Sequence, residues 1–291
     1  METEKKHIIK VIQDQEMAEV FENLCLFDDA FMSLVFDQNI EATELLLHII
    51  LERNDMEVIE VIGQREYKNP IVGRHSIRID IFAQDSSGKV YDIEVQRSNK
   101  GADVHRARFN SSMIDTRMLQ EGQDYEELHD SYVIFITEND VMGKGLPLYH
   151  INRMVEETDE LFGDGSHIIY VNGNCKDNDN PVGKLMHDFR CKRAEDMFYP
   201  VIAKQVKHFK ETKGGQSAMS ITWDELMEKR AKIRAEEMAE EMAEEMAEES
   251  RMDTLFTAVK SLMESMKLSV EQAMEALKVS ETDKKTLLKR F

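Results

Sequence analysis

The stretch RHSIRIDIFAQDSSGKVYDIEVQ, residues 74–96, constrains the fold of this 291-residue chain more than any other part of the sequence. Two runs of alternating apolar and polar residues flank the short polar loop SSG, and side chains that alternate with period two are typical of β-strands. Gly88 ends that loop, where a glycine can take the left-handed conformation that closes a three-residue hairpin loop. The pattern therefore predicts a β-hairpin that pairs residue 85 with residue 89.

The predicted register sets two acidic side chains against each other. It places Asp80 opposite Glu94, and alternation adds Asp92 and Gln96 to the face that carries Glu94. Directly paired side chains have Cβ atoms about 5 Å apart, so the two carboxylates repel each other unless something neutralises them. The opposite face of the first strand would carry Ile77, Ile79 and Ile81.

A divalent metal ion would neutralise such a pair of carboxylates. Mg²⁺ binds one or two carboxylates, keeps several waters and contacts substrate phosphate oxygens. A site of this kind can generate a nucleophile for phosphodiester hydrolysis. The alternative is an ordinary half-exposed hairpin, in which Arg78 and Lys89 pair with the acids. The hairpin alone leaves both interpretations open.

The remaining pattern predicts an α/β core with mixed strand directions. Apolar residues at helical spacing and short apolar runs are the signals used. In chain order they predict two helices within 26–53, a strand at 56–64, the hairpin, a helix at 102–119, strands at 131–137 and 167–173, and helical structure over 181–210 that Pro200 punctuates.

A Gly/Ser-rich stretch at 211–220 predicts the end of the first domain, which we place at residues 1–213. A Glu/Met-rich helix over 222–250 would follow, with a methionine every fourth residue. That repeat drifts about 40° per step around a helix, so it favours a solvated spacer over a partner-binding stripe. Residues 251–291 would form a small helical tail, with a DNA-reading helix-turn-helix as the alternative.

The charge of the chain excludes one class of nucleic-acid binder. The formal net charge is -20, and residues 235–250 hold eight glutamates and no basic residue. A protein that coats nucleic acid through its overall charge is therefore excluded. Any contact with DNA must come from a local basic surface or through bound cations.

Cysteine use and hydropathy predict a cytoplasmic protein. Cys25, Cys175 and Cys191 form no CxxC pair and no Cys/His cluster with zinc spacing, so we expect three reduced cysteines. No segment approaches the roughly 18 consecutive apolar residues of a membrane span, and the beginning of the sequence lacks the apolar run of a signal peptide. We expect no membrane partner.

Several segments, in order from about Asp28 to Met219, resemble the PD-(D/E)XK nuclease family transposases, also called recombination-promoting nucleases. The similar segments are DDAFMSLVF, IDIFAQDSSGKVYDIEVQ, HRARF, SYVIFIT and HIIYVNG. The resemblance implies a restriction-endonuclease-like mixed sheet flanked by helices, here with a C-terminal helical tail. It also implies a DNA endonuclease that depends on Mg²⁺ or Mn²⁺.

The resemblance assigns roles to residues of the hairpin. The metal-binding Asp of the family corresponds to Asp80 and the metal-binding Glu to Glu94. The superfamily usually has a Lys two residues after that Glu, but this chain has Gln96, as is common in this branch. A glutamine cannot act as a base, and it would orient the attacking water. Superfamily nucleases often add a Glu from the first helix, for which Glu44 is the candidate and a solvated helix face the alternative.

Two arginines follow the hairpin on the next predicted helix. Arg106 and Arg108 would hold the scissile phosphate, because a guanidinium matches phosphate geometry; ion pairs with nearby acids are the alternative. The interpretation as a whole is a metal-dependent DNA endonuclease, for which a homodimer would suit cleavage of two strands. The alternative is a catalytically weak nuclease fold that binds DNA or a protein partner.

Overall fold

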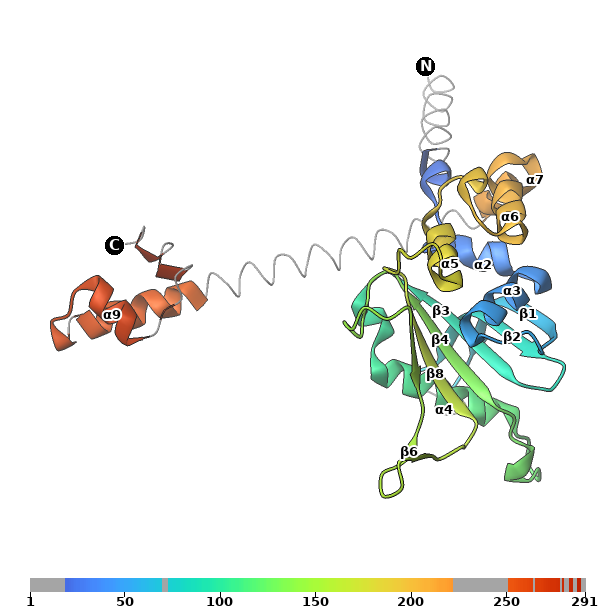
Figure 1. Ribbon diagram of the computed structural model, residues 1–291, viewed down its shortest axis with the longest axis horizontal. Helices are drawn as coiled ribbons and strands as arrows, with labels where there is room; N and C mark the ends of the chain where they lie inside the picture. Colours follow the sequence, from blue (N-terminus) through green and yellow to red (C-terminus); the bar gives the residue numbers. More distant parts are fainter. Residues whose placement is uncertain are drawn as a thin grey trace, which may run out of the picture. The chain divides into compact units, whose positions relative to one another are not determined.

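The computed structural model describes residues 19–69, 73–221, 251–263, 265–277, 279, 283–284 and 287–288 (Figure 1). The chain divides into two compact units between Thr222 and Trp223. Among the described residues, no helix is both long and apolar enough to cross a membrane.

The first unit is built on a six-stranded mixed sheet, which confirms the predicted α/β class. The strand order is β1-β2-β3-β4-β8-β5. The first three strands pair antiparallel, β3, β4 and β8 run parallel, and β5 pairs antiparallel with β8. The strands are β1 (Val58–Tyr67), β2 (Ile77–Asp85), β3 (Val90–Gln96), β4 (Ser131–Thr137), β5 (Leu148–Ile151) and β8 (Ser166–Asn172), with a small separate ribbon of β6 (Met154–Val155) and β7 (Glu160–Leu161).

Helices cover the sheet, as the family resemblance implies. Helix α4 packs on β4 and β8, whereas α2 and α3 pack on the β1–β3 part of the sheet, and α5 and α6 join them (Figure 1). The helices of this unit are α2 (Asp29–Phe36), α3 (Ile40–Leu51), α4 (Val104–Met118), α5 (Pro181–Arg190), α6 (Pro200–Glu211) and α7 (Lys213–Ile221).

Side chains at the helix starts explain where three of these helices begin. The side chain of Asn39 accepts a hydrogen bond from Ala42 N, which satisfies a free donor at the start of α3. Asp103 does the same at the start of α4, and Asn180 at the start of α5. Pro200 is the first residue of α6, where its fixed φ and missing N–H cost nothing, so it punctuates the helical segment as predicted.

The hairpin has the predicted register. Ile81 pairs with Ile93 and Phe82 with Asp92, and Asp85 N donates to Lys89 O at 3.1 Å. Gly88 has a φ of 85°, the left-handed conformation expected of it. A Cβ at that glycine would also lie 2.7 Å from the ring of the exposed His129, which would have to move aside.

The alternation expected along β2 does not hold through its whole length. Ile77 and Ile79 pack with Phe82 in the apolar cluster beneath α4, although a regular pleat would put odd and even residues on opposite faces. The break falls near Asp80, which the register sets opposite Gln64. Gln64 has a positive φ of 55°, a conformation that is uncommon outside glycine and interrupts a regular pleat. The prediction that the three isoleucines of this strand share one face is therefore wrong.

The break expected at 211–220 is helix α7. Thr212 connects it to α6, and Thr212 Oγ1 accepts a hydrogen bond from Gly215 N at 3.1 Å. A Cβ on Gly215 would overlap the backbone of His208 and Phe209, so the glycine allows α7 to approach α6 closely. The composition that suggested a linker thus serves a tight helix–helix contact.

One lysine of α6 joins distant parts of the first unit. Lys210 Nζ donates to Leu24 O at 2.6 Å and to Glu22 O at 3.2 Å, and it also bonds to Lys192 O. The ammonium lies 5.5 Å from the ring centre of Phe31. These contacts tie α6 to the segment that precedes α2.

The second unit has a small apolar core of its own. Residues 251–263 are helical, and α9 (Val270–Ala276) begins with a capping box formed by Ser269 and Gln272. The buried core residues are Met252, Val259, Ala273, Met274, Val279 and Leu287. The Glu/Met-rich segment predicted as a helix over 222–250 lies outside the described residues, and the proposed domain boundaries stay a prediction.

Candidate active site

Three carboxylates of the hairpin are buried close to one another, and two of them, Asp92 and Glu94, contact α4. The exposed fractions of Asp80, Asp92 and Glu94 are 5%, 0% and 0%. Such burial is expensive for charged groups unless partners or ions compensate for the lost hydration. The contacts of each carboxylate therefore indicate which of its oxygens have partners and which could bind an ion.

Asp80 is fixed at the point where the hairpin ladder stops. The β2–β3 ladder ends at the pair Ile81 and Ile93, and beyond it Asp80 Oδ2 accepts a hydrogen bond from Val95 N at 3.2 Å. The backbone carbonyl of Asp80 accepts a second bond, from Ser33 Oγ of α2, at 3.1 Å. The carboxylate thus takes the place of a backbone acceptor, next to Glu94 in β3.

Two side chains of α4 hold the carboxylates of β3. Arg106 Nη2 forms an ion pair with Glu94 Oε2, and Asn110 Nδ2 donates to Asp92 Oδ2 at 3.0 Å. Arg106 and Asn110 are four residues apart and so lie on one face of the helix. Each carboxylate keeps one oxygen without a hydrogen-bond partner, namely Asp92 Oδ1 and Glu94 Oε1, and both of these oxygens are buried.

The electrostatics of this cluster oppose full ionisation. Burial raises the pKa of Glu94 well above its ordinary value, and the charges of Asp80 and Asp92 raise it further, against the lowering effect of Arg106. Burial also raises the pKa of Asp92, to about 7, partly offset by the bond from Asn110. An interaction between Asp92 and Glu94 lowers the first pKa and raises the second, as expected when Glu94 carries a proton that the two share.

The two unpartnered oxygens fit a hard divalent cation. A buried carboxylate oxygen with no donor needs a proton or a positive ion. Mg²⁺ and similar ions take carboxylate oxygens as ligands, and such an ion would replace the proton that Asp92 and Glu94 otherwise share.

Gln96 lies beside this group, where the sequence resemblance implied a residue that orients water. Its Nε2 is 3.4 Å from Glu94 Oε2, a long contact, and the side chain is half-buried. Gly101, in the short helix η1 (Asn99–Ala102), faces the amide so closely that a Cβ there would overlap Gln96 Oε1. The glycine therefore makes room for the glutamine side chain.

Two predicted residues lie away from the carboxylates. Glu44 Oε2 accepts a hydrogen bond from Val58 N at 3.0 Å, at the start of β1. Val58 pairs with Asp85, five residues along β2 from Asp80, which is about 16 Å at the usual rise per strand residue. The structure thus does not bring Glu44 to the site, because its carboxylate satisfies the first donor of a strand.

The two predicted arginines behave differently from each other. Arg106 contacts Glu94 and also donates to Gly101 O at 2.8 Å, with 38% of its side chain exposed. Arg108 is exposed, and two residues along a helix place it about 200° around the axis from Arg106. The ion pair that was the alternative for Arg106 is present. The alternative pairing for Lys89 is not with the hairpin acids but with Asp130, at 2.9 Å.

Sequence reasoning did not assign a role to Asn110. Its position four residues after Arg106 was the available signal, because that spacing puts both side chains on the helix face that covers the hairpin. Asp92 was placed on the face of Glu94 from alternation but was given no role. Its unpartnered oxygen shows that it belongs to the site.

The arrangement of the sheet and helices places the protein in a fold class. A mixed sheet with an antiparallel carboxylate-bearing hairpin, flanked by helices, is a restriction-endonuclease-like fold. The chain belongs to the PD-(D/E)XK nuclease family transposases, whose family pattern matches residues 30–177, about half of its length. The match includes all the predicted site residues, and it supports a nuclease or transposase-like role. No curated protein and no solved structure gives a significant match.

Proposed function

We propose that this protein is a DNA endonuclease that depends on a divalent metal ion, with Asp80 and Glu94 as ligands for Mg²⁺ or Mn²⁺. The observation that carries the proposal is the pair of buried, unpartnered oxygens of Asp92 and Glu94 beside the Asp80 carboxylate. Membership of a nuclease family supports the same activity. The unpartnered Oδ1 of Asp92 would add a further carboxylate oxygen beside the ion.

The residues of the chain would each contribute a separate part of the reaction. When bound, the divalent ion would act as a Lewis acid that makes water more acidic and stabilises charge on the phosphate. The bond from Val95 N orients the Asp80 carboxylate, and the bond from Ser33 Oγ holds the Asp80 backbone. Arg106 fixes one oxygen of Glu94 and so leaves the other turned to the metal position. Gln96 has no titratable proton, and its amide would orient the attacking water by hydrogen bonds.

The exposed part of Arg106 could contact substrate while the same side chain holds Glu94. A guanidinium has five N–H donors, and the contacts with Glu94 and with Gly101 O each use one of its terminal nitrogens. The remaining N–H groups suit a phosphate oxygen of the strand to be cut. Arg108 lies on the exposed side of α4 and would contact a phosphate farther along the duplex.

A second candidate function is a nuclease fold with weak activity that binds DNA or a protein. The observation that favours it is Gln96, because the usual Lys at this position supplies a positive charge that an amide lacks. Self-association as a homodimer and cytoplasmic location stay predictions in either case.

Nicking of supercoiled plasmid DNA in Mg²⁺ or Mn²⁺ tests the proposal. The wild-type protein should nick the plasmid, and Asp80→Ala and Glu94→Gln should each lower the rate by more than about 100-fold, since losing a ligand costs at least as much as losing a residue that orients one. Asp85→Asn is the matched control, because Asp85 is a buried acid of the same strand outside the site.

DNA binding measured in parallel separates the two candidate functions. Titration in Ca²⁺, which supports binding more readily than cleavage, should show that Asp80→Ala still binds DNA. A wild-type protein that binds DNA but never nicks it would favour the binding module. Nicking that survives Asp80→Ala would mean that a contaminant or another site is responsible.

A further inference from the structure

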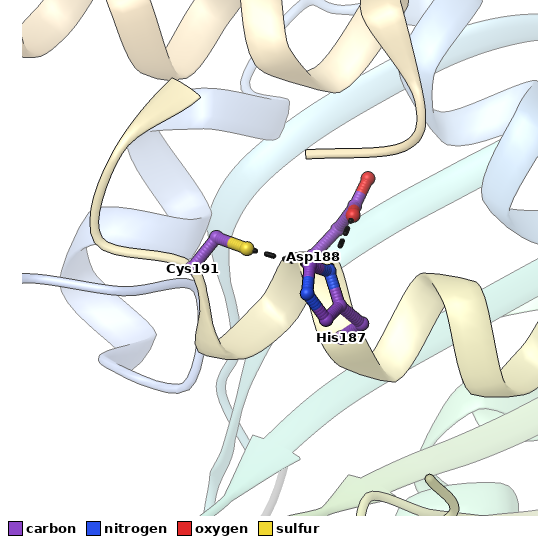
Figure 2. A group of neighbouring side chains, drawn as sticks. All are labelled: His187, Asp188 and Cys191. Carbon is purple, nitrogen blue, oxygen red and sulfur yellow. Dashed lines mark hydrogen bonds and ion pairs between the residues drawn. The ribbon is translucent and has the colours of Figure 1, made fainter. Parts of the chain in front are cut away.

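A second group of metal-ligating side chains lies at the end of α5, away from the carboxylates of the hairpin. His187, Asp188 and Cys191 each offer one ligand atom, and these three atoms all lie within 4.8 Å of one another. Figure 2 shows the sulfur of Cys191 and the carboxylate of Asp188 both directed at the imidazole of His187. The group lies outside the part of the chain that matches the nuclease family.

The contacts within the group converge on a single ring nitrogen. His187 Nδ1 is 3.4 Å from Cys191 Sγ and 3.3 Å from Asp188 Oδ1. One nitrogen carries at most one proton, so it cannot donate to both neighbours. A catalytic Cys–His–Asp relay needs the two nitrogens of the ring for its two partners. This geometry does not provide a relay, but it does place a nitrogen, a sulfur and an oxygen around one point.

Asp188 is held rigidly by the helix that follows. Its Oδ1 accepts a hydrogen bond from Phe198 N at 2.7 Å, and its Oδ2 accepts one from Tyr199 N at 2.8 Å. The side chain is fully buried, and the two bonds fix its orientation at the start of α6. A carboxylate oxygen has a second lone pair, so Oδ1 can accept this bond and still bind a cation.

Cys191 is not built as a nucleophile. Burial, together with the negative charges of Asp188 and Asp196, raises the pKa of its thiol to about 11. Reactive cysteines have the opposite environment, with positive charge nearby. A divalent cation at the point where the three atoms meet would reverse this balance, because a thiol that coordinates a metal ion loses its proton.

We propose that His187, Asp188 and Cys191 bind a borderline-soft divalent transition metal ion of the Zn²⁺ class. Imidazole nitrogen, thiolate sulfur and carboxylate oxygen are the three ligand types that Zn²⁺ takes. His187 and Cys191 are four residues apart on one helix face, and the charges of the thiolate and the carboxylate match a dication. Three protein ligands leave one position for water or a small ligand.

The site is distinct in chemistry from the hairpin carboxylates. Thiolate ligands select Zn²⁺ over Mg²⁺, whereas a cluster of carboxylates suits Mg²⁺ or Mn²⁺. A bound ion would also fasten the end of α5 to the start of α6 through Asp188. The inference therefore stands whether or not the protein cleaves DNA.

Titration of the chelator-treated, full-length protein with Co²⁺ tests the site, because Co²⁺ reports its own ligands. Wild-type protein should show a sulfur-to-metal charge-transfer band that saturates at one Co²⁺ per chain, and Zn²⁺ should abolish this band. Cys191→Ser should abolish the band, and His187→Asn should weaken Co²⁺ binding by more than about tenfold. Zn²⁺ should raise the melting temperature of the wild type but not of Cys191→Ser.

Matched variants keep the test specific. Cys175→Ser removes a partly exposed thiol outside the group, and His208→Asn removes a histidine from α6; both should keep the charge-transfer band. Circular dichroism would show that each variant is folded. Asp188→Asn is not a useful variant, because Asp188 also supports α6. Absence of the band in wild-type protein, or a band that persists in Cys191→Ser, would overturn the proposal.

Discussion

Replacing Asp92 by asparagine should stabilise the protein at neutral pH when no divalent cation is bound. Burial raises the pKa of this carboxyl from 3.8 to about 7. Ionising it in the folded state then costs about 4 kcal/mol more than in the unfolded chain, at about 1.4 kcal/mol for each tenfold change in the equilibrium constant. An asparagine has no charge to bury. It can still accept the bond from Asn110, and its amide could donate to Glu94 Oε1.

The pH dependence gives this prediction a definite sign. Between pH 3.8 and about 7 the folded protein holds the proton of Asp92 more tightly than the unfolded chain does. The free energy of unfolding of the wild type therefore decreases as pH rises through that window. The variant lacks this loss. Its stability advantage should be near zero at pH 4 and reach about 1–4 kcal/mol at pH 8, the upper value being the full ionisation cost.

Urea unfolding of both proteins in chelator, from pH 4 to pH 8, measures the difference directly, and the effects of titrating groups that do not interact with Asp92 cancel in it. Asp85→Asn is the matched control. Asp85 accepts hydrogen bonds from Ser87 N, Lys89 N and Tyr91 Oη, so its carboxylate is satisfied. That variant should lose about 1–3 kcal/mol. An Asp92→Asn protein that is less stable than wild type at pH 8 would refute the argument from unpartnered oxygens.

In the plasmid assay, Gln96→Ala should slow nicking by about 10- to 1,000-fold, whereas Gln96→Lys should keep or raise it. Gly101→Ala should resemble Gln96→Ala, because its Cβ displaces the amide, and unchanged nicking by both would exclude the water-orienting role. Arg106→Ala should lose about 1–3 kcal/mol in urea melts, because Glu94 loses its partner, and the exposed Arg108→Ala should change little; equal losses would contradict this. Deleting residues 222–291 should leave melting temperature and low-salt DNA affinity nearly unchanged or raise the affinity, since eight glutamates repel DNA; light scattering and DNA titration would reveal any opposite result.

The hairpin was predictable because two independent signals agree on it. Alternation and the Gly88 loop set one register, and a shift by one residue would have moved every side chain to the other face. The prediction that the isoleucines of β2 share one face was wrong because a backbone irregularity beside Asp80 interrupts the alternation. That irregularity depends on how β1 pairs with β2, and the sequence of β2 alone does not encode it. The assignment of Glu44 to the site depended in the same way on a separate strand, since the partner of Glu44 is a backbone donor of β1.

Other parts of the structure depend on contacts that composition does not encode. The glycines of 211–220 look like a linker, and only the close approach of α6 shows that Gly215 serves a helix. The pair His187 and Cys191 has helical spacing, but it does not resemble the common zinc patterns of two cysteines and two histidines. Asp188 completes the group only because the start of α6 orients it.

The contacts of Lys210 have a consequence for the order in which the first unit opens. Lys210 Nζ meets Leu24 O across 186 residues of chain, so this bond closes one of the longest loops in the unit. Closing a loop of that length costs entropy that other contacts must offset first. During folding the bond should therefore form after the main barrier, and during unfolding it should break before that barrier is reached. Replacing Lys210 by Met should speed unfolding while leaving the folding rate nearly unchanged, which stopped-flow urea jumps would measure.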